Sequence, residues 1–174
     1  MPADLGAVIS VVALLIPTGP LDIPRDSVEL TAGPRVRVEF DPAVWKPLAP
    51  LAQPQPGAGQ SMTWAIDQAR WLQITVASRP ERETDDEHRK QLLMAQKFRG
   101  DPADLVRERR GKVADRDWQV LEFRNASTRP PRSEIHYFLQ TADGCASLFV
   151  ICDEADLAEH RGAIDAFLGK IRLR

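Results

Sequence analysis

The sequence predicts an α+β domain built on an antiparallel β-sheet, because hairpin and helix signals occur together near its end. Residues 145–152 (CASLFVIC) form an apolar run of strand length, and a second strand pattern at residues 135–140 precedes them. The Asp143-Gly144 step between the two runs supplies the positive φ that a tight hairpin needs. Residues 154–169 then repeat apolar side chains at helical spacing. We therefore expect the domain to end in a hairpin and an amphipathic helix.

Length and composition suit one globular domain, which we place at residues 27–174. Of the 174 residues, 43% are hydrophobic and 28% are charged, which allows an ordinary apolar core. The net charge of −2 gives no long-range field that would attract nucleic acid or an anionic membrane. We therefore expect no nucleic-acid partner.

Residues 1–26 are expected to be an apolar segment and a linker outside the main core. The apolar run at residues 5–16 is too short for a stable transmembrane span, which needs about 20 residues. Three interpretations stay open: a truncated export signal, a short membrane-proximal segment, or a strand or helix packed on the domain. An export signal would place the protein outside the cytoplasm, in the periplasm for example. The packed segment would leave it cytoplasmic.

The first half of the domain predicts strands separated by proline-rich turns. Residues 27–40 have strand character, and Trp45 lies at the end of the turn that follows them. Prolines and glycines make residues 46–60 a loop or flexible insert, because few backbone donors remain for regular structure. Residues 62–66 and 71–76 then alternate as the two strands of a hairpin.

A helix is expected to begin at Thr84, because Thr84 and Glu87 form a capping box. Leu92, Ala95 and Phe98 make its narrow apolar stripe. After this helix we expect an exposed strand at residues 106–113 and a good strand at residues 118–124. In the last helix, the expected apolar stripe consists of Leu157, Ile164, Leu168 and Ile171.

The strands at residues 118–124 and 145–152 carry apolar side chains on both faces. Such strands are typical of a sheet that is covered on both sides. The helix at Thr84 and the last helix are the available covers. The sequence thus predicts a three-layer α/β/α sandwich with helices on both faces of an antiparallel sheet.

This order of elements resembles the Mog1/PsbP-like superfamily and its bacterial branch of small domains once labelled DUF1795. The resemblance covers residues 27–174 and rests on three features: the Pro42-x-x-Trp45 turn, the Asp143-Gly144 hairpin and the Ile-Arg-Leu ending at residues 171–173. It implies the three-layer sandwich and a binding or adaptor domain in place of an enzyme. Members include photosystem extrinsic subunits, a Ran-binding factor, periplasmic lipoproteins and chaperones for secreted effectors.

The residues that most often carry chemistry show no catalytic or metal-binding spacing. His88, His136 and His160 belong to no ligand motif. Cys145 and Cys152 lie seven apart in one strand, on opposite faces, so they cannot form a disulfide with each other. We expect no catalytic residues, cofactor or metal. The alternative is a small hydrolase that uses His136 with a nearby acid or thiol.

Two tryptophans are the candidate partner-binding residues. Trp71 points away from the aliphatic face of its strand, and Trp45 lies beside the proline-rich loop. Either both are core residues under a helix, or they line a groove for a partner. We expect a non-enzymatic binding or adaptor domain that recognises another protein, with a carrier of a small apolar ligand as the alternative. No motif specifies the partner or an oligomeric state.

Overall fold

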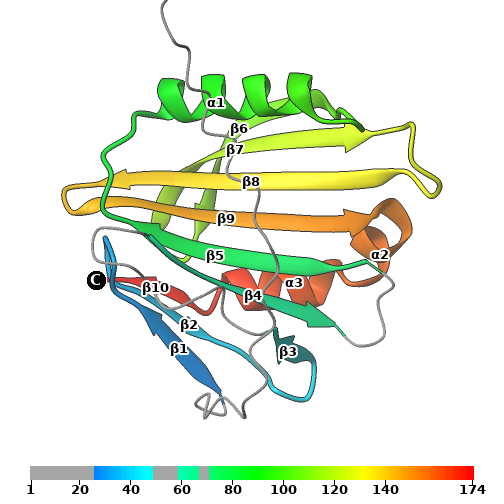
Figure 1. Cartoon of the computed structure of the whole chain (residues 1–174). Helices are drawn as coiled ribbons and strands as arrows, with labels where there is room; N and C mark the ends of the chain where they lie inside the picture. The colour runs from blue at the N-terminus through cyan, green and yellow to red at the C-terminus, as the bar shows by residue number, and fades with distance from the viewer. Residues whose placement is uncertain (1–25, 49–58, 67–70) are drawn as a thin grey trace, which may run out of the picture.

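The computed structural model describes residues 26–48, 59–66 and 71–174, and shows an α+β fold of two antiparallel sheets and three helices in these residues (Figure 1). The seven-stranded sheet contains, in spatial order, β3 (Trp45–Pro47), β4 (Gln60–Ile66), β5 (Gln73–Arg79), β9 (Gly144–Asp153), β8 (Arg132–Thr141), β7 (Arg116–Asn125) and β6 (Asp104–Val113). The smaller sheet has the order β1 (Ser27–Leu30), β2 (Val36–Glu39) and β10 (Ile171–Leu173). The helices are α1 (Asp85–Phe98), α2 (Glu154–Glu159) and α3 (Arg161–Leu168). The expected α+β class is confirmed.

The closing hairpin lies at the centre of the large sheet. Strand β9 pairs with β8 on one side and with β5 on the other. The hairpin turn closes between Thr141 and Gly144, and Gly144 has a φ of 132°. A Cβ at Gly144 would lie 2.1 Å from the carbonyl oxygen of Arg79, so the turn requires glycine for space as well as for conformation.

Helix α1 begins where the capping box predicts. Of the expected apolar stripe, Leu92 is partly buried against the cluster of Ala103, Leu121 and Phe123, whereas Ala95 and Phe98 are exposed. The Glu87 amide donates to Thr84 Oγ1 at 3.2 Å, and the Thr84 amide donates to Glu87 Oε2 at 2.8 Å. The buried residues of α1 are the polar His88 and Gln96, whereas Phe98 of the expected apolar stripe is 81% exposed. Phe98 lies two residues beyond Gln96, about 200° around the helix, and therefore points away from the sheet.

The last helix differs from the single helix expected at residues 154–169. It is broken at His160 into α2 and α3. Ile171, which we expected in the helical stripe, lies in β10 opposite Val38 of β2. Helix α3 ends at Leu168 with Gly169 as its C-cap, and the free edge of β2 then offers main-chain partners to the residues that follow.

The main core fills the space between α3 and the large sheet. The ring of Phe167 lies 4.9 Å from that of Trp45 and 5.3 Å from that of Trp64, centroid to centroid. Odd-numbered residues of β8 such as Ile135 and Tyr137 belong to this core.

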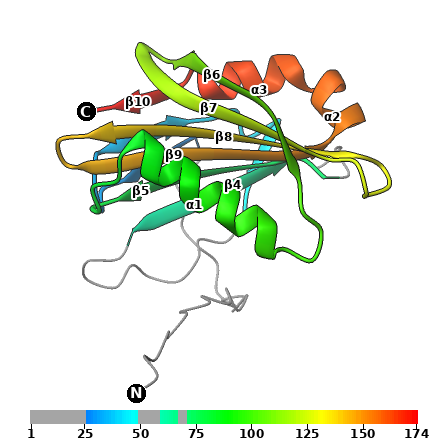
Figure 2. The ribbon, with the colours of Figure 1, turned by 90° about the horizontal axis from the view of Figure 1, so that it is seen from above.

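Even-numbered residues of β8 meet α1 instead. The ring of Phe138 stacks on His88, and Glu134 bonds to Gln96. Figure 2 shows α1 and α3 well apart, with β8 and β9 between them in that view.

Other expectations have mixed outcomes. The strands expected at residues 62–66 and 71–76 are confirmed as parts of β4 and β5, which pair in register, although β5 begins only at Gln73. Those expected at residues 106–113 and 118–124 are confirmed within β6 and β7.

The expected loop at residues 46–60 begins inside β3, and residues 49–58 lie outside the described part. Residues 1–25 also lie outside it, so the interpretations of that segment stay predictions. Among the described residues, no helix is long and apolar enough to cross a bilayer.

Candidate functional site

The structure places the two candidate partner-binding tryptophans in different environments, one buried and one half-exposed. Trp45 is 3% exposed and packs in the main core against Phe167. Its ring therefore lines no partner groove, and the expectation that it does so is corrected: Trp45 is a core residue under α3. Trp71 is 47% exposed and presents about half of its side chain to solvent.

Trp71 is held by two neighbours from distant parts of the chain. The guanidinium carbon of Arg132, at the start of β8, lies 4.9 Å from the centre of the indole ring, a cation–π distance. The Trp71 amide donates to Asp156 Oδ2 of α2 at 3.1 Å. We call Trp71, Arg132 and Asp156 the Trp71 surface. The aromatic ring of Trp71 is half-exposed and lies beside the Arg132 guanidinium.

The end of the sheet that carries the Trp71 surface is braced by further polar contacts. Arg124 Nη2 of β7 donates to Glu154 Oε2 at the start of α2, at 3.1 Å. The Glu154 amide donates to the carbonyl oxygen of Pro131 at 3.0 Å. These bonds join β7, α2 and the segment before β8 close to the Trp71 surface.

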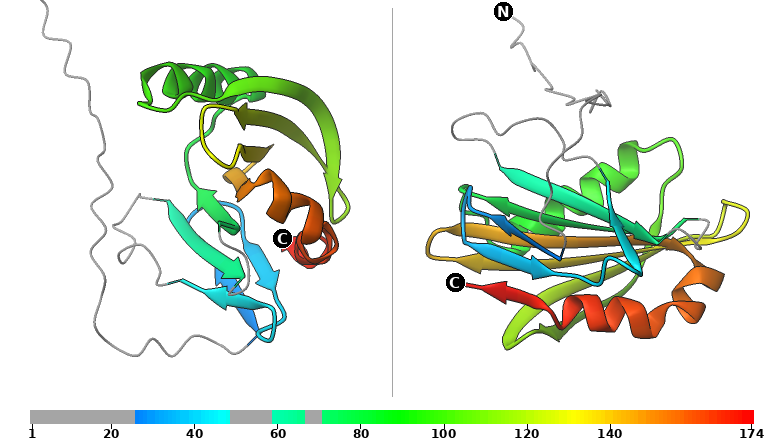
Figure 3. Two further views of the ribbon diagram at one scale, coloured as in Figure 1. Left: turned by 90° about the vertical axis from the view of Figure 1, so that its right-hand side faces the viewer. Right: turned by 90° about the horizontal axis from the view of Figure 1, so that it is seen from below.

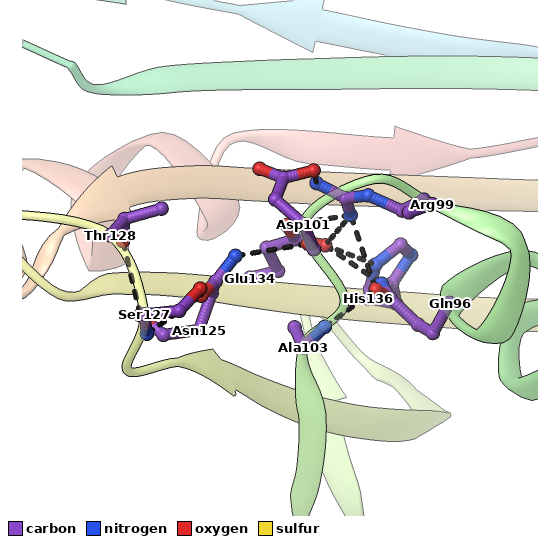
Figure 4. A network of polar contacts seen from close by, with 9 residues as sticks. All are labelled: Gln96, Arg99, Asp101, Ala103, Asn125, Ser127, Thr128, Glu134 and His136. Atoms are coloured by element: carbon purple, nitrogen blue, oxygen red, sulfur yellow. Dashed lines mark hydrogen bonds and ion pairs between the residues drawn. The ribbon is translucent and has the colours of Figure 1, made fainter.

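A buried polar layer lies between α1 and the sheet, and the sequence interpretation missed it. We call it the α1 polar layer; its members are Glu83, His88, Gln96, Arg99, Glu134 and His136. Gln96 Nε2 donates to Glu134 Oε2 at 3.0 Å, while Gln96 Oε1 accepts from the Ala103 amide at 3.1 Å (Figure 4). The signal in the sequence was the alternation of Glu134, His136 and Phe138 with apolar residues along β8.

Glu134 is the centre of this layer and is fully buried. Burial by itself would raise its pKa, but the neighbouring His136, the hydrogen bonds and charge of Arg99 and the Gln96 amide outweigh burial. Together they lower the pKa from 4.5 to about 2. Such a carboxylate is a poor proton acceptor at neutral pH, because its charged form is already satisfied.

His136, the centre of the hydrolase alternative, is packed among aromatic rings. Its ring centroid lies 4.4 Å from that of Phe149 and 5.5 Å from that of Phe123. Its Nε2 atom lies 3.9 Å from Glu134 Oε2, too far for a hydrogen bond. Burial raises the pKa of Cys145, and it raises that of Cys152 to about 12, so both thiols are protonated at neutral pH.

His88 occupies the other end of the α1 polar layer. Its Nδ1 atom lies 3.2 Å from Glu83 Oε2, and its ring stacks on Phe138 with 4.0 Å between centroids. Burial lowers the pKa of His88, although the hydrogen bond and charge of Glu83 act in the opposite direction. Among the described residues, no group of three or more His, Cys, Asp or Glu side chains is placed to hold a metal ion.

Comparison with known proteins identifies the fold. No family model and no curated protein matches the sequence. The solution structure of cyanobacterial PsbP (CyanoP) from Synechocystis sp. PCC 6803 is similar at a TM-score of 0.56 and 11% identity, over 90% of this chain and 98% of that one. The type VI secretion immunity protein TplEi from Pseudomonas aeruginosa, solved with an "L" peptide, is similar at a TM-score of 0.50 and 9% identity, over 85% and 70%.

A protein from Bacteroides thetaiotaomicron VPI-5482 is similar at a TM-score of 0.48 and 11% identity, over 80% of this chain, which spans only 45% of that protein. The likeness to CyanoP and TplEi is one of fold. It supports the coarser part of the resemblance drawn from the sequence: the chain has a PsbP-like α+β fold.

Proposed function

We propose that this protein is a non-enzymatic binding or adaptor domain that recognises another protein through the Trp71 surface. The observation that carries the proposal is the half-exposed indole of Trp71, which lies beside the Arg132 guanidinium while the Trp71 backbone amide donates to Asp156. Tryptophan and arginine are the residue types that most often dominate binding energy at protein interfaces. A ring that is already held in place loses little conformational entropy when a partner covers it.

The chemistry of the buried groups supports the non-enzymatic part of this proposal. The carboxylate nearest to His136 is engaged by Arg99 and Gln96, and the two thiols are buried and protonated. Peptide binding by TplEi, which shares the fold, is compatible with a protein partner here. Aromatic side chains fill the contacts that α1 and α3 make with the large sheet, so within the described residues these contacts do not support the alternative of a small apolar ligand carrier.

The finer architecture belongs to the same proposal. Even-numbered residues of β8 meet α1 and odd-numbered residues join the core with α3, which supports a three-layer α/β/α sandwich. We further propose that the chain belongs to the DUF1795-like bacterial branch of the Mog1/PsbP-like superfamily, on the strength of the sequence features given above.

The test is quantitative partner capture with three forms of the protein. Wild type, Trp71→Ala and Phe98→Ala are each immobilised, and proteins retained from cells are quantified by mass spectrometry. Phe98 is the matched control because it is an aromatic residue, 81% exposed, on α1. We expect wild type and Phe98→Ala to retain the same partner and Trp71→Ala to retain about tenfold less, which corresponds to about 1.4 kcal/mol.

Thermal melting accompanies the capture experiment. The melting temperature of Trp71→Ala should stay within about 3 °C of wild type, because the ring is only half-buried. Equal retention by all three forms, or failure of wild type to retain any specific protein, would overturn the proposal. A large loss of stability in Trp71→Ala would show that the ring supports the fold instead.

A further inference from the structure

A cleft of about 760 Å³ lies between the β6–β7 hairpin and α3, away from the Trp71 surface. Figure 3 shows this hairpin curving toward α3. Tyr137 and Leu168 form part of the lining. The charged residues of the lining are Arg109, Lys112, Arg161, Arg172, Asp115 and Asp165.

Most cations of this cleft have no ion-pair partner. Arg109 is paired, because its Nε lies 3.0 Å from Glu122 Oε1. Within the described part of the chain, Lys112, Arg161 and Arg172 have no carboxylate oxygen within 4.0 Å. The two aspartates of the lining are likewise outside ion pairs, so the uncompensated cations outnumber the uncompensated carboxylates.

The cleft runs beside a free sheet edge. Strand β6 is the last strand of the large sheet and pairs only with β7 in the described structure. A bulge falls between Leu105 and Arg107, and pairing with β7 is regular from Arg107 to Val113. Along this stretch the outward-facing main-chain groups are available to another strand. Arg109 faces Val120 in register, so its side chain lies on the face that borders the cleft.

The charges of β6 favour one kind of strand. Between residues 107 and 112 the strand carries Arg107, Arg109, Arg110 and Lys112 against the single acid Glu108. A second copy of β6 paired at this edge would bring arginines opposite arginines, which is destabilising. Arg109 and Arg110 are ion-paired with Glu122 and Asp85, so a strand that carries carboxylates would meet Arg107 and Lys112 of β6, which have no ion-pair partner in the described residues.

We propose that the free edge of β6 and the adjoining cleft bind an extended acidic segment of a partner protein, which adds to the sheet as a further strand. Main-chain bonds to residues 107–113 would supply affinity. Carboxylates of the segment would meet Lys112, Arg161 and Arg172, and supply specificity. This inference rests on the proposed protein-binding function but uses a different surface, so either one can fail without the other.

The first test uses an array of ten-residue peptides that alternate Asp or Glu with Val, Thr or Tyr. Each peptide is matched by a version with Asn or Gln at the acidic positions. Binding of the labelled full chain to both sets is measured at low and at moderate salt. We expect the acidic set to bind at least tenfold more tightly and to weaken as salt rises. Equal binding of the two sets overturns the proposal and leaves the charges of β6 as protection against edge-to-edge aggregation.

The second test locates the site with charge-matched variants. Lys112→Gln/Arg161→Gln should weaken binding of the best acidic peptide about tenfold, as expected for two partly exposed ion pairs. Lys97→Gln/Arg129→Gln removes the same charge from residues outside the cleft and should leave binding unchanged. Equal weakening by the two doubles would mean non-specific attraction and would overturn the assignment.

Two further measurements test the mode of binding. In hydrogen exchange, outward-facing amides of residues 107–113 should become protected when the acidic peptide is bound. Absence of that protection overturns strand addition, and citrate that binds as tightly as the peptide overturns the need for an extended segment. Trp71→Ala serves as the control for the other surface and should bind the acidic peptide like wild type.

Discussion

Glu134 of β8 accepts bonds from Arg99 Nη1 on both carboxylate oxygens, each at 2.8 Å, and so ties the end of α1 to the sheet. Arg99 is the C-cap residue of α1. The contact therefore anchors the helix at the end where its own backbone bonding stops. The contact requires the charged carboxylate form of Glu134, so the attachment of α1 to the sheet depends on pH.

Glu134→Gln should flatten the acid dependence of stability. The folded state lowers the pKa of Glu134 from 4.5 to about 2, so its stabilising effect is complete above pH 4.5 and is lost as pH falls toward 2. The effect is on the order of 3 kcal/mol. Urea unfolding of wild type and Glu134→Gln at pH 7 and pH 3 measures it. The exposed Glu159→Gln is the control, and a wild-type slope in Glu134→Gln contradicts the assignment.

His88→Phe should reduce the loss of stability in mildly acidic solution. Burial lowers the pKa of His88 from 6.5, so the folded state favours neutral imidazole; its contribution is complete above pH 6.5 and is lost as pH falls below that value. The groups that face the ring are Glu83, Arg79 and His136. Denaturant unfolding between pH 7.5 and 5.5 tests this, with His160→Gln as control. An NMR titration of wild type that places His88 at or above 6.5 would argue against it.

Ala114→Gly should stabilise the protein. Ala114 lies in the turn between β6 and β7 with a φ of 50°, a conformation that side chains disfavour by about 1–2 kcal/mol. Glycine removes this strain and adds backbone entropy to the unfolded state, so we expect a net gain of about 0.5–1 kcal/mol. Thermal and denaturant unfolding measure the gain. Ala114→Val should destabilise, and the opposite order would contradict the turn conformation.

Two glycines should respond oppositely to alanine. In Gly144→Ala, the new Cβ would lie 2.1 Å from Arg79 O at a φ of 132°, and we expect a loss of more than about 2 kcal/mol. In Gly162→Ala, the new Cβ meets no atom within 4 Å and lies in α3, so we expect a gain of up to about 1 kcal/mol. Urea unfolding of the two variants side by side decides; similar effects would mean that the hairpin turn has relaxed.

The strands and the start of α1 were predictable because their signals are local. Residues 145–152 are apolar on both faces, and Thr84 with Glu87 specifies a helix start whatever surrounds it. The buried face of α1 was not predictable in this way. His88 and Gln96 are buried because Glu134 and Phe138, far along the chain, present matching partners.

The candidate site shows the same limit. Phe167 packs against Trp45, whereas Trp71 is 47% exposed and, among the described residues, has the Arg132 guanidinium over its ring. Ile171 fits a helical spacing in the sequence, and only the free edge of β2 explains why it lies in a strand. Exposure and edge pairing depend on distant segments, so local patterns do not encode them.

Pairing of β2 with β10 joins segments from opposite ends of the domain. During synthesis, β2 is made long before Ile171 and Leu173 of β10. The edge of β2 that pairs with β10 therefore has no partner strand until the chain is nearly complete. The large sheet gains its central strand β9 earlier and can assemble first. Contacts of such long sequence separation slow folding. The small sheet is therefore expected to close last, and its amides should be among the last to gain protection in refolding followed by hydrogen exchange.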